Sequence, residues 1–203
     1  MKWIWIRHGE TEINRAGRYL GHYDEPLSDY GMGQIHDLAE RLTVEKVHYI
    51  YSSDLQRTKA TAEILSQMLG TSISLTKELS EFNFGEWDLK TYEEIMSENR
   101  KQAERWYNDP FVIAPPNGET VKQLGERVDL FLQSVQQTMS KDDTALIISH
   151  GGPMRWFLSN WIMNDVTEFW TVQHYSHADG FIAECDGERW TSVPLQKITR
   201  NRR

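Results

Sequence analysis

The sequence predicts an α/β fold, a three-layer sandwich with a mostly parallel central sheet and helices on both of its faces. Short apolar runs at residues 2–6, 47–52 and 145–149 are typical of strands that are buried on both sides. Amphipathic helical patterns separate these runs along the chain. Strands that alternate with helices form layered α/β folds, so we expect the helices to cover both faces of the sheet.

Each predicted helix has apolar residues at steps of three and four. Ser28 is placed to cap the first helix, whose apolar face comprises Met32, Ile35, Leu38, Ala39 and Leu42. The second helix covers residues 55–69 and ends before Gly70. The third, at residues 119–139, has the clearest apolar face: Val121, Leu124, Val128, Phe131, Val135 and Met139.

The stretch from residue 81 to 118 interrupts this alternation. It is rich in aromatic residues and closes with two proline-containing turns. We interpret it as a partly helical insertion that folds over one end of the sheet, where the active site is expected. Residues 72–75 and 181–185 are weaker strand candidates. We therefore expect a single domain over residues 1–203.

The composition excludes several classes of partner. The chain has 203 residues, with 39% hydrophobic and 26% charged, as in ordinary globular proteins. No apolar run is long enough to cross a membrane, so we expect no membrane partner and a cytoplasmic location. The net charge of −8 argues against nucleic-acid binding. The sequence does not determine the oligomeric state.

A histidine followed by glycine stands at the end of two predicted strands. His8 follows residues 2–6 after Arg7, and His150 follows residues 145–149. Ligands of open α/β sheets bind outside the carboxyl ends of the strands, and glycine leaves room for their close approach. One such histidine alone is more often structural. The repeated pattern favours a functional site.

Arginine side chains next to these positions favour a phosphate ligand. Arg7 adjoins His8, and Arg57 stands where a further strand gives way to a helix. The planar guanidinium group holds phosphate oxygens with paired hydrogen bonds, and phosphoryl transfer depends mainly on positioning and positive charge. An acidic protein that binds phosphate must also concentrate its positive charge locally.

Phosphate ester cleavage also needs a proton for the leaving oxygen. Glu81, Glu86 and Asp88 are candidate donors, and the residues alone do not choose among them. The chain lacks the GxxxxGK[ST] loop and the HExxH zinc motif. His174 and His177 are three residues apart without a nearby acidic cluster, so we expect them to be structural or surface residues.

Taken together, these motifs resemble those of the histidine phosphatase superfamily, whose fold is shared with cofactor-dependent phosphoglycerate mutases. The similarity runs from residue 3 to about residue 157, in the family's order and spacing. It includes the segments 7–12, 21–28, 52–62, 116–120 and 149–152, with Gly31, Glu81 and Arg127 between them. Each motif alone is weak, whereas the ordered set is specific.

The resemblance implies a role for each site residue. His8 would attack phosphorus and become phosphohistidine. Arg7, Arg57 and His150 would hold the phosphoryl oxygens, with Asn14 and Gly151 in the same binding set. Glu81 would protonate the leaving group and then help water to hydrolyse the intermediate. No metal or other cofactor is implied, and the expected partner is a small phosphorylated metabolite.

Within the superfamily, the chain is most similar to the phosphatase branch. We expect a metal-independent phosphomonoesterase, with a slight preference for an alpha-ribazole-phosphate or broad-specificity phosphatase. A phosphoserine phosphatase and a phosphoglycerate mutase remain alternatives. A non-catalytic phosphate-binding protein would be expected to lose the nucleophile, an arginine or the acid. One departure concerns Asp88, after which many relatives have glycine and this chain has Leu89.

Overall fold

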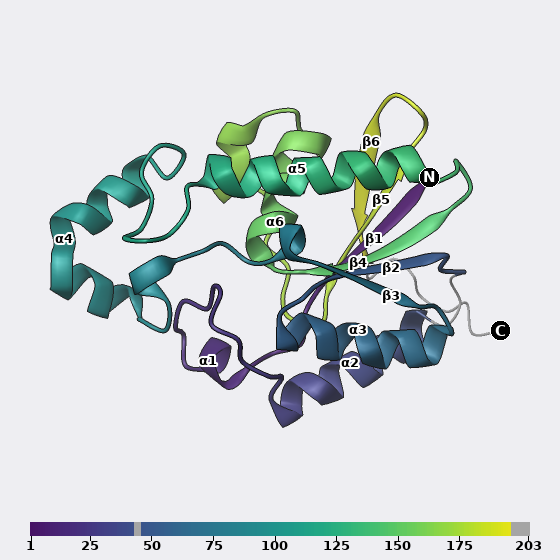
Figure 1. Cartoon of the computed structure of the whole chain (residues 1–203), viewed down its shortest axis with the longest axis horizontal. Helices are drawn as coiled ribbons and strands as arrows, with labels where there is room; N and C mark the ends of the chain where they lie inside the picture. The colour runs from purple at the N-terminus through teal and green to yellow at the C-terminus, as the bar shows by residue number, and fades with distance from the viewer. Residues whose placement is uncertain (43–45, 196–203) are drawn as a thin grey trace.

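The computed structural model describes residues 1–42 and 46–195 (Figure 1). Within these ranges one sheet of six strands has the order β3-β2-β4-β1-β5-β6. The strands are β1 (Lys2–Arg7), β2 (Tyr49–Ser53), β3 (Ile73–Thr76), β4 (Thr144–Ser149), β5 (Gly180–Cys185) and β6 (Trp190–Pro194). Strands β1 to β4 are mutually parallel. At one edge of the sheet, β5 is antiparallel to both of its neighbours, β1 and β6. The predicted mostly parallel sheet is confirmed.

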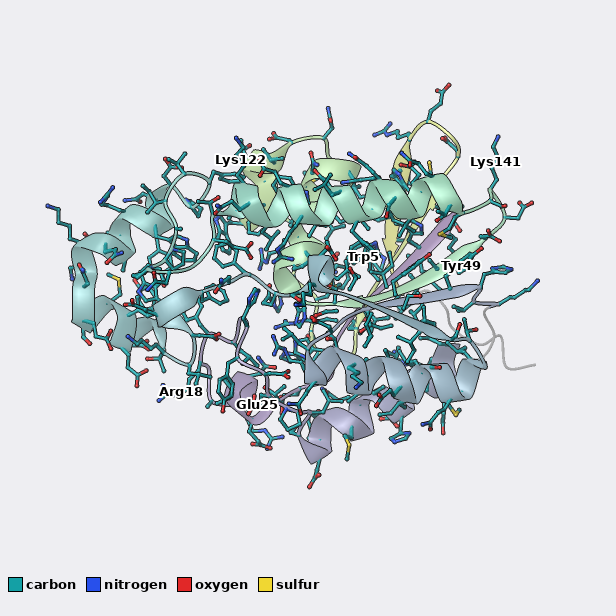
Figure 2. All side chains as sticks on the ribbon, viewed as in Figure 1. Trp5, Arg18, Glu25, Tyr49, Lys122 and Lys141 are labelled. Carbon is teal, nitrogen blue, oxygen red and sulfur yellow. The ribbon has the colours of Figure 1, made fainter. Side chains whose placement is uncertain are left out.

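Helices cover both faces of the sheet, as predicted. Helices α2 (Asp29–Leu42) and α3 (Gln56–Leu69) lie on one face, and α5 (Val121–Thr138) and α6 (Gly151–Trp156) lie on the other (Figure 1). Side chains of β1 alternate between the two cores. Trp5 packs on the α5 side, where Figure 2 shows it between the helix and the sheet, and Ile4 packs on the α2 side.

Local sequence signals fix the helix ends. Ser28 Oγ accepts the N–H of Gly31 at 3.0 Å in the first turn of α2. Gly70 ends α3 with a positive φ of 68°, which glycine adopts at little cost. One residue of the predicted apolar face of α5 differs. Leu132 is fully buried there, whereas the predicted Phe131 is half-buried against Tyr51. The helical period of 3.6 residues per turn accounts for this difference, because a strict repeat of three and four residues can miss the buried face by one position.

The insertion is partly helical, as predicted. It contains the 3-10 helix η2 (Gly85–Trp87) and the 17-residue helix α4 (Tyr92–Asn108). The short elements outside it are α1 (Glu12–Arg15), η1 (Lys77–Leu79), the π-helix η3 (Phe157–Ile162) and η4 (Val166–Trp170). Helix α4 lies beyond the carboxyl ends of the central strands, near α1 (Figure 1). Trp106 of α4 is buried against Phe82 and Trp87. Arg18 Nη2 donates to Glu94 at 3.1 Å, which joins the insertion to the segment after α1.

Strand β6 was not predicted. Its burial alternates along the strand, and Pro194 stands at its end, as suits an edge strand. No helix in the described residues is long and apolar enough to span a membrane.

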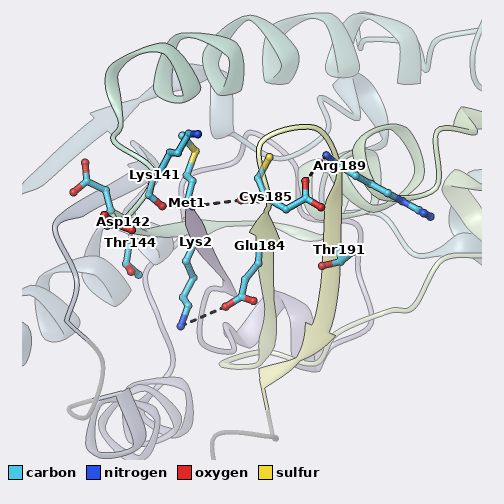
Figure 3. Close-up of a pocket in the computed structure, with 11 residues that line it drawn as sticks. Met1, Lys2, Lys141, Asp142, Thr144, Glu184, Cys185, Arg189 and Thr191 are labelled. Carbon is cyan, nitrogen blue, oxygen red and sulfur yellow. Dashed lines mark hydrogen bonds and ion pairs between the residues drawn. The ribbon is translucent and has the colours of Figure 1, made fainter.

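A cavity of about 450 Å³ lies at the amino end of β1, at the opposite end of this strand from His8. It is lined by side chains of both charges, among them Lys2, Lys141, Glu184 and Arg189 (Figure 3).

Candidate active site

The two strand-end histidines lie next to each other. Strands β1 and β4 are parallel neighbours in which Arg7 is the register partner of Ser149. The N–H of His8 donates to the carbonyl of Ser149 at 3.1 Å, just past the paired residues. The imidazole rings of His8 and His150 are 5.0 Å apart between centroids. Two adjacent strands of one sheet therefore deliver both rings to the same place.

A backbone contact defines the reactive nitrogen of His8. Its Nδ1 lies 2.7 Å from the carbonyl oxygen of Gly9. A carbonyl oxygen only accepts, so Nδ1 carries the proton and Nε2 keeps its lone pair. Burial, followed by the charges of Arg57 and Arg7, holds the pKa of His8 well below its ordinary value. The ring is therefore neutral at neutral pH, and its Nε2 lone pair is free.

His150 is fully buried and has two unused polar atoms. Neither ring nitrogen has a hydrogen-bond partner among the described residues. Burial, followed by the charges of Arg57 and His8, lowers the pKa of His150 well below its ordinary value. A buried polar group without a partner is costly, so such groups are usually explained by a ligand or water. One nitrogen of the neutral ring can donate to a bound oxygen.

Arg57 is held rigidly by carbonyl groups. Its Nη1 donates to Tyr23 O at 2.9 Å and its Nη2 to Gly21 O at 2.6 Å, while Nε has no partner among the described residues. The residue is 0% exposed. Burial lowers the pKa of Arg57 to about 10, and nearby acids, Glu81 first, oppose this change. Arg57 therefore stays charged at neutral pH with Nε still available as a donor.

Arg7 is anchored by His174 and Tyr175, which were not predicted to belong to the site. Its Nη1 donates to His174 Nε2 at 2.9 Å and to Tyr175 O at 3.0 Å. His177 lies beside His8, with 5.3 Å between the centroids of the two rings. Burial, followed by the charge of Arg7, lowers the pKa of His177 to about 3. Both histidines thus border the site.

The signal for these histidines lies in the topology of β5. The N–H of Ala178 donates to Arg7 O and His8 O at 3.1 Å each, which places the loop before β5 against the end of β1. An antiparallel β5 beside β1 would have predicted this position, but strand direction is not visible in the residue pattern. Arg155 also borders the site, and it lines a small cavity together with Arg7, Gly151 and His174.

Glu81 reaches the site from the segment that follows η1. It is 9% exposed, and its Oε1 accepts the N–H of Phe82 at 2.8 Å and that of Gly152 at 2.9 Å. Its other oxygen, Oε2, has no hydrogen bond to the described residues and lies 3.6 Å from where a Cβ on Gly151 would stand. One oxygen is thus fixed by backbone donors, and the other has no hydrogen bond within the described part of the chain.

The two other acids have different surroundings. Glu86 is exposed and accepts from Asn117 Nδ2 at 2.7 Å. Both oxygens of Asp88 accept backbone N–H groups, from Gly21 at 2.7 Å and from Tyr23 at 2.8 Å. Since Arg57 binds the carbonyls of these same two residues, Asp88 supports the loop that holds the arginine. The geometry favours Glu81 among the three acids.

The departure after Asp88 lies at a turn with an unusual backbone conformation. Leu89 has a φ of 68°, in the left-handed region that glycine adopts freely and other residues adopt at a cost. Its N–H nonetheless donates to Tyr19 O at 2.8 Å. Leucine therefore keeps the backbone path that glycine would favour at this position. The turn keeps its geometry and carries local strain.

Asn14 and Gly151 each have one hydrogen-bond donor available for a ligand. Asn14 Oδ1 accepts the N–H of Thr11 at 3.3 Å in the capping box of α1, which leaves Nδ2 as its free donor. Gly151 is the first residue of α6, and no side chain caps this helix. The first N–H groups of a helix have no partner within the helix, so that of Gly151 is available to an anion.

The assembled site combines the neutral imidazole of His8 with two fixed arginine side chains and one carboxylate, that of Glu81. Unpartnered donors of Arg7, Arg57 and His150 gather around His8. This is an arrangement for holding an oxyanion beside a nitrogen lone pair. Among the described residues, no group of three or more His, Cys, Asp or Glu side chains is arranged to hold a metal ion.

Comparison with known proteins identifies the family and fold that this chain resembles. The family model for the histidine phosphatase superfamily (branch 1) matches residues 3–197. Phosphoserine phosphatase 1 of Hydrogenobacter thermophilus is 32% identical over 84% of this chain and 81% of its own. The adenosylcobalamin/alpha-ribazole phosphatase of Salmonella typhimurium is 28% identical over 91% of each chain. The crystal structure of the alpha-ribazole phosphatase from Shigella flexneri matches 98% of both chains, with a TM-score of 0.88 and 26% identity.

Proposed function

Because the chain belongs to the histidine phosphatase superfamily, we propose that it hydrolyses small phosphate monoesters through a phosphohistidine formed on His8. Phosphatase activity follows from the family. The residue roles, the intermediate and the substrate are proposed from the site. One observation carries them: the Nδ1–H of His8 is bound to Gly9 O, which leaves Nε2 to attack phosphorus among unpartnered cationic donors.

In the first step, the Nε2 lone pair of His8 forms a bond to phosphorus while the bond from phosphorus to the ester oxygen breaks. The ester oxygen keeps the bonding electrons and takes a proton from Oε2 of Glu81. Arg7, Arg57, His150 and the N–H of Gly151 hold the other phosphoryl oxygens, with Nδ2 of Asn14 assisting. The imidazole becomes positively charged, and its Nδ1–H bond to Gly9 O stabilises that charge.

In the second step, water attacks phosphorus and gives one proton to the carboxylate of Glu81. The N–P bond breaks and its electrons return to Nε2, which restores neutral His8. The same carboxylate thus acts first as acid and then as base. Its Oε1 keeps the backbone bonds to Phe82 and Gly152 throughout, so that Oε2 transfers the proton in both steps.

Alpha-ribazole phosphate is the first candidate substrate and phosphoserine the second. The similarity to the Salmonella and Shigella enzymes supports the first, and the Hydrogenobacter relative supports the second. A mutase would return the phosphoryl group to bound substrate instead of to water. Release of phosphate compared with isomerisation of 3-phosphoglycerate separates these functions, and a panel of phosphorylated metabolites ranks the substrates by kcat/KM.

The nucleophile is tested with His8→Ala. Turnover should fall by about four orders of magnitude or more, because no neighbour replaces the nitrogen. Acid-labile phosphate should form on the wild type and be absent from the variant, with an unchanged circular dichroism spectrum as the control for folding. Substantial turnover in His8→Ala would refute the proposal. Absence of turnover in the wild type for every substrate would favour a non-catalytic phosphate-binding protein.

Metal independence is part of the same proposal. The positive charge at the site comes from Arg7 and Arg57, so excess chelator should leave the rate unchanged. Activity that returns only with added magnesium or zinc would contradict it. The cytoplasmic location expected from the sequence also belongs to this proposal, and cell fractionation tests it.

A further inference from the structure

An ion pair outside the site fixes the backbone on both sides of Glu81. Arg127 of α5 binds Glu119 through two contacts, Nη2 to Oε1 at 2.7 Å and Nε to Oε2 at 3.1 Å. The two side chains are 21% and 14% exposed. A bidentate pair of this kind, largely shielded from water, is geometrically rigid.

The guanidinium group also binds two carbonyls of the acid's own segment. Arg127 Nη1 donates to Glu78 O at 2.7 Å, and Nη2 donates to Glu81 O at 2.9 Å. The carbonyl of Glu81 accepts a further bond from His22 Nε2 at 2.9 Å. The peptide unit that follows the Cα of Glu81 is therefore held from two sides.

Glu119 completes the attachment on the other side of the acid. Its Oε1 accepts the N–H of Asn83 at 2.8 Å, and its own N–H donates to Asn83 O at 3.0 Å. Asn83 lies near the start of the insertion and Glu119 directly follows its end, so these hydrogen bonds join the two ends of the insertion.

We infer that Arg127 and Glu119 are positioning residues for the proton transfer by Glu81, an inference that rests on the proposed function. Neither residue needs to contact substrate. Proton transfer requires Oε2 of Glu81 to lie within hydrogen-bond reach of the leaving oxygen, and the backbone at Glu81 sets that reach. Displacements of about 1 Å can slow a reaction by about 100-fold, so an anchored backbone affects the chemical step itself.

The experiment measures single-turnover phosphoryl transfer from an alkyl phosphate and from nitrophenyl phosphate. Nitrophenolate leaves without a proton, so its rate reports everything except the acid. Arg127→Lys keeps the positive charge, but one ammonium group cannot span Glu78 O, Glu81 O and the Glu119 carboxylate. Glu119→Gln keeps the shape and removes the charge of the partner. Both should slow the alkyl ester by about 10- to 100-fold and the nitrophenyl ester by less than about threefold.

A matched control lies on the same helix. Lys122 and Glu126 form an exposed ion pair at 3.9 Å that makes no contact with the acid's segment. Lys122→Met should leave both rates unchanged. In a Glu81→Gln background, Arg127→Lys should add less than about a threefold loss, because residues that act through one group are not additive.

The outcomes separate the two proposals. If Glu81→Gln is selective for the alkyl ester and both test variants match the wild type, the positioning role is refuted and the acid assignment stands. Equal losses for both esters would show a general structural effect and also refute positioning. If Glu81→Gln slows both esters equally, the acid assignment is refuted, and the positioning role that depends on it is refuted as well. If Arg127→Lys does not fold, Glu119→Gln decides.

Discussion

Oε1 of Glu81 accepts a hydrogen bond from the backbone N–H of Gly152 at 2.9 Å. This bond joins the proposed acid to the helix that begins directly after His150. A Cβ added at residue 152 would stand 2.4 Å from the same oxygen and 3.0 Å from Leu124 Cδ1. The position of the acid and the identity of residue 152 are therefore coupled.

Gly152→Ala should displace the Glu81 carboxylate. We expect turnover of an alkyl phosphate to fall by about 10-fold or more, since the displaced oxygen no longer meets the leaving group. Nitrophenyl phosphate should be affected less. Gly33→Ala is the control, because a Cβ at this position of α2 meets nothing within 4 Å. A Gly152→Ala enzyme with wild-type rates on both substrates would contradict this coupling.

The three candidate acids can be compared directly. Glu81→Gln should slow single-turnover hydrolysis of alkyl phosphates far more than that of nitrophenyl phosphate, by a ratio of about 10² or more. Glu86→Gln should change neither rate, because Glu86 is exposed and bound to Asn117. Asp88→Asn should slow both esters alike, since it loosens the loop that holds Arg57. A selective loss in either of these two variants would move the acid role to that residue.

Acidification should destabilise the protein before its carboxylates titrate. Burial lowers the pKa of His8, His150 and His177 below the ordinary value of 6.5. The unfolded chain then takes up protons first, so stability is full above pH 6.5 and is lost as the pH falls toward the folded-state values. Each histidine contributes a slope of up to about 1.4 kcal/mol per pH unit. Urea unfolding at pH 7 and pH 5 measures this loss, and His177→Asn should reduce it.

At position 89, glycine should give a more stable protein than alanine, the reverse of the usual order. Its φ of 68° penalises any Cβ, so Leu89→Gly should be more stable than Leu89→Ala by about 1 kcal/mol. Both variants lose the same contacts beyond Cβ, which makes alanine the matched reference. Urea denaturation compares their free energies of unfolding. Alanine equal to or better than glycine would show that the turn carries no strain.

The sequence predicted the layered core well because burial imposes a strong pattern. Strands β1, β2 and β4 and helices α2, α3 and α5 lie within about two residues of their predicted limits. Their apolar residues repeat with the period of the element that buries them. Strand β6 was not predicted because this short edge strand, which ends at Pro194, carries only a weak alternating pattern.

The site was predictable where motifs stand at strand ends and unpredictable where tertiary contacts decide. His8 and His150 share one local pattern, and the structure brings them together. His174 and His177 come from a loop whose position depends on the antiparallel direction of β5, which no residue pattern shows. Arg127 was among the motif residues, but its hydrogen bonds to backbone carbonyls about fifty residues away leave no local signal, so its proposed positioning role was not predicted.

The pairing of β1 with β4 also bears on how the protein opens. The amide of His8 is bonded to Ser149 O between two central strands, so hydrogen exchange there requires the sheet to separate. Helix α4, by contrast, carries a kink at Asn99 and lies at the periphery (Figure 1). Sub-global unfolding that releases α4 would leave both histidines in place. We therefore expect the amide of His8 to exchange with the slowest unit of the fold, so that partly unfolded molecules retain the proposed nucleophile.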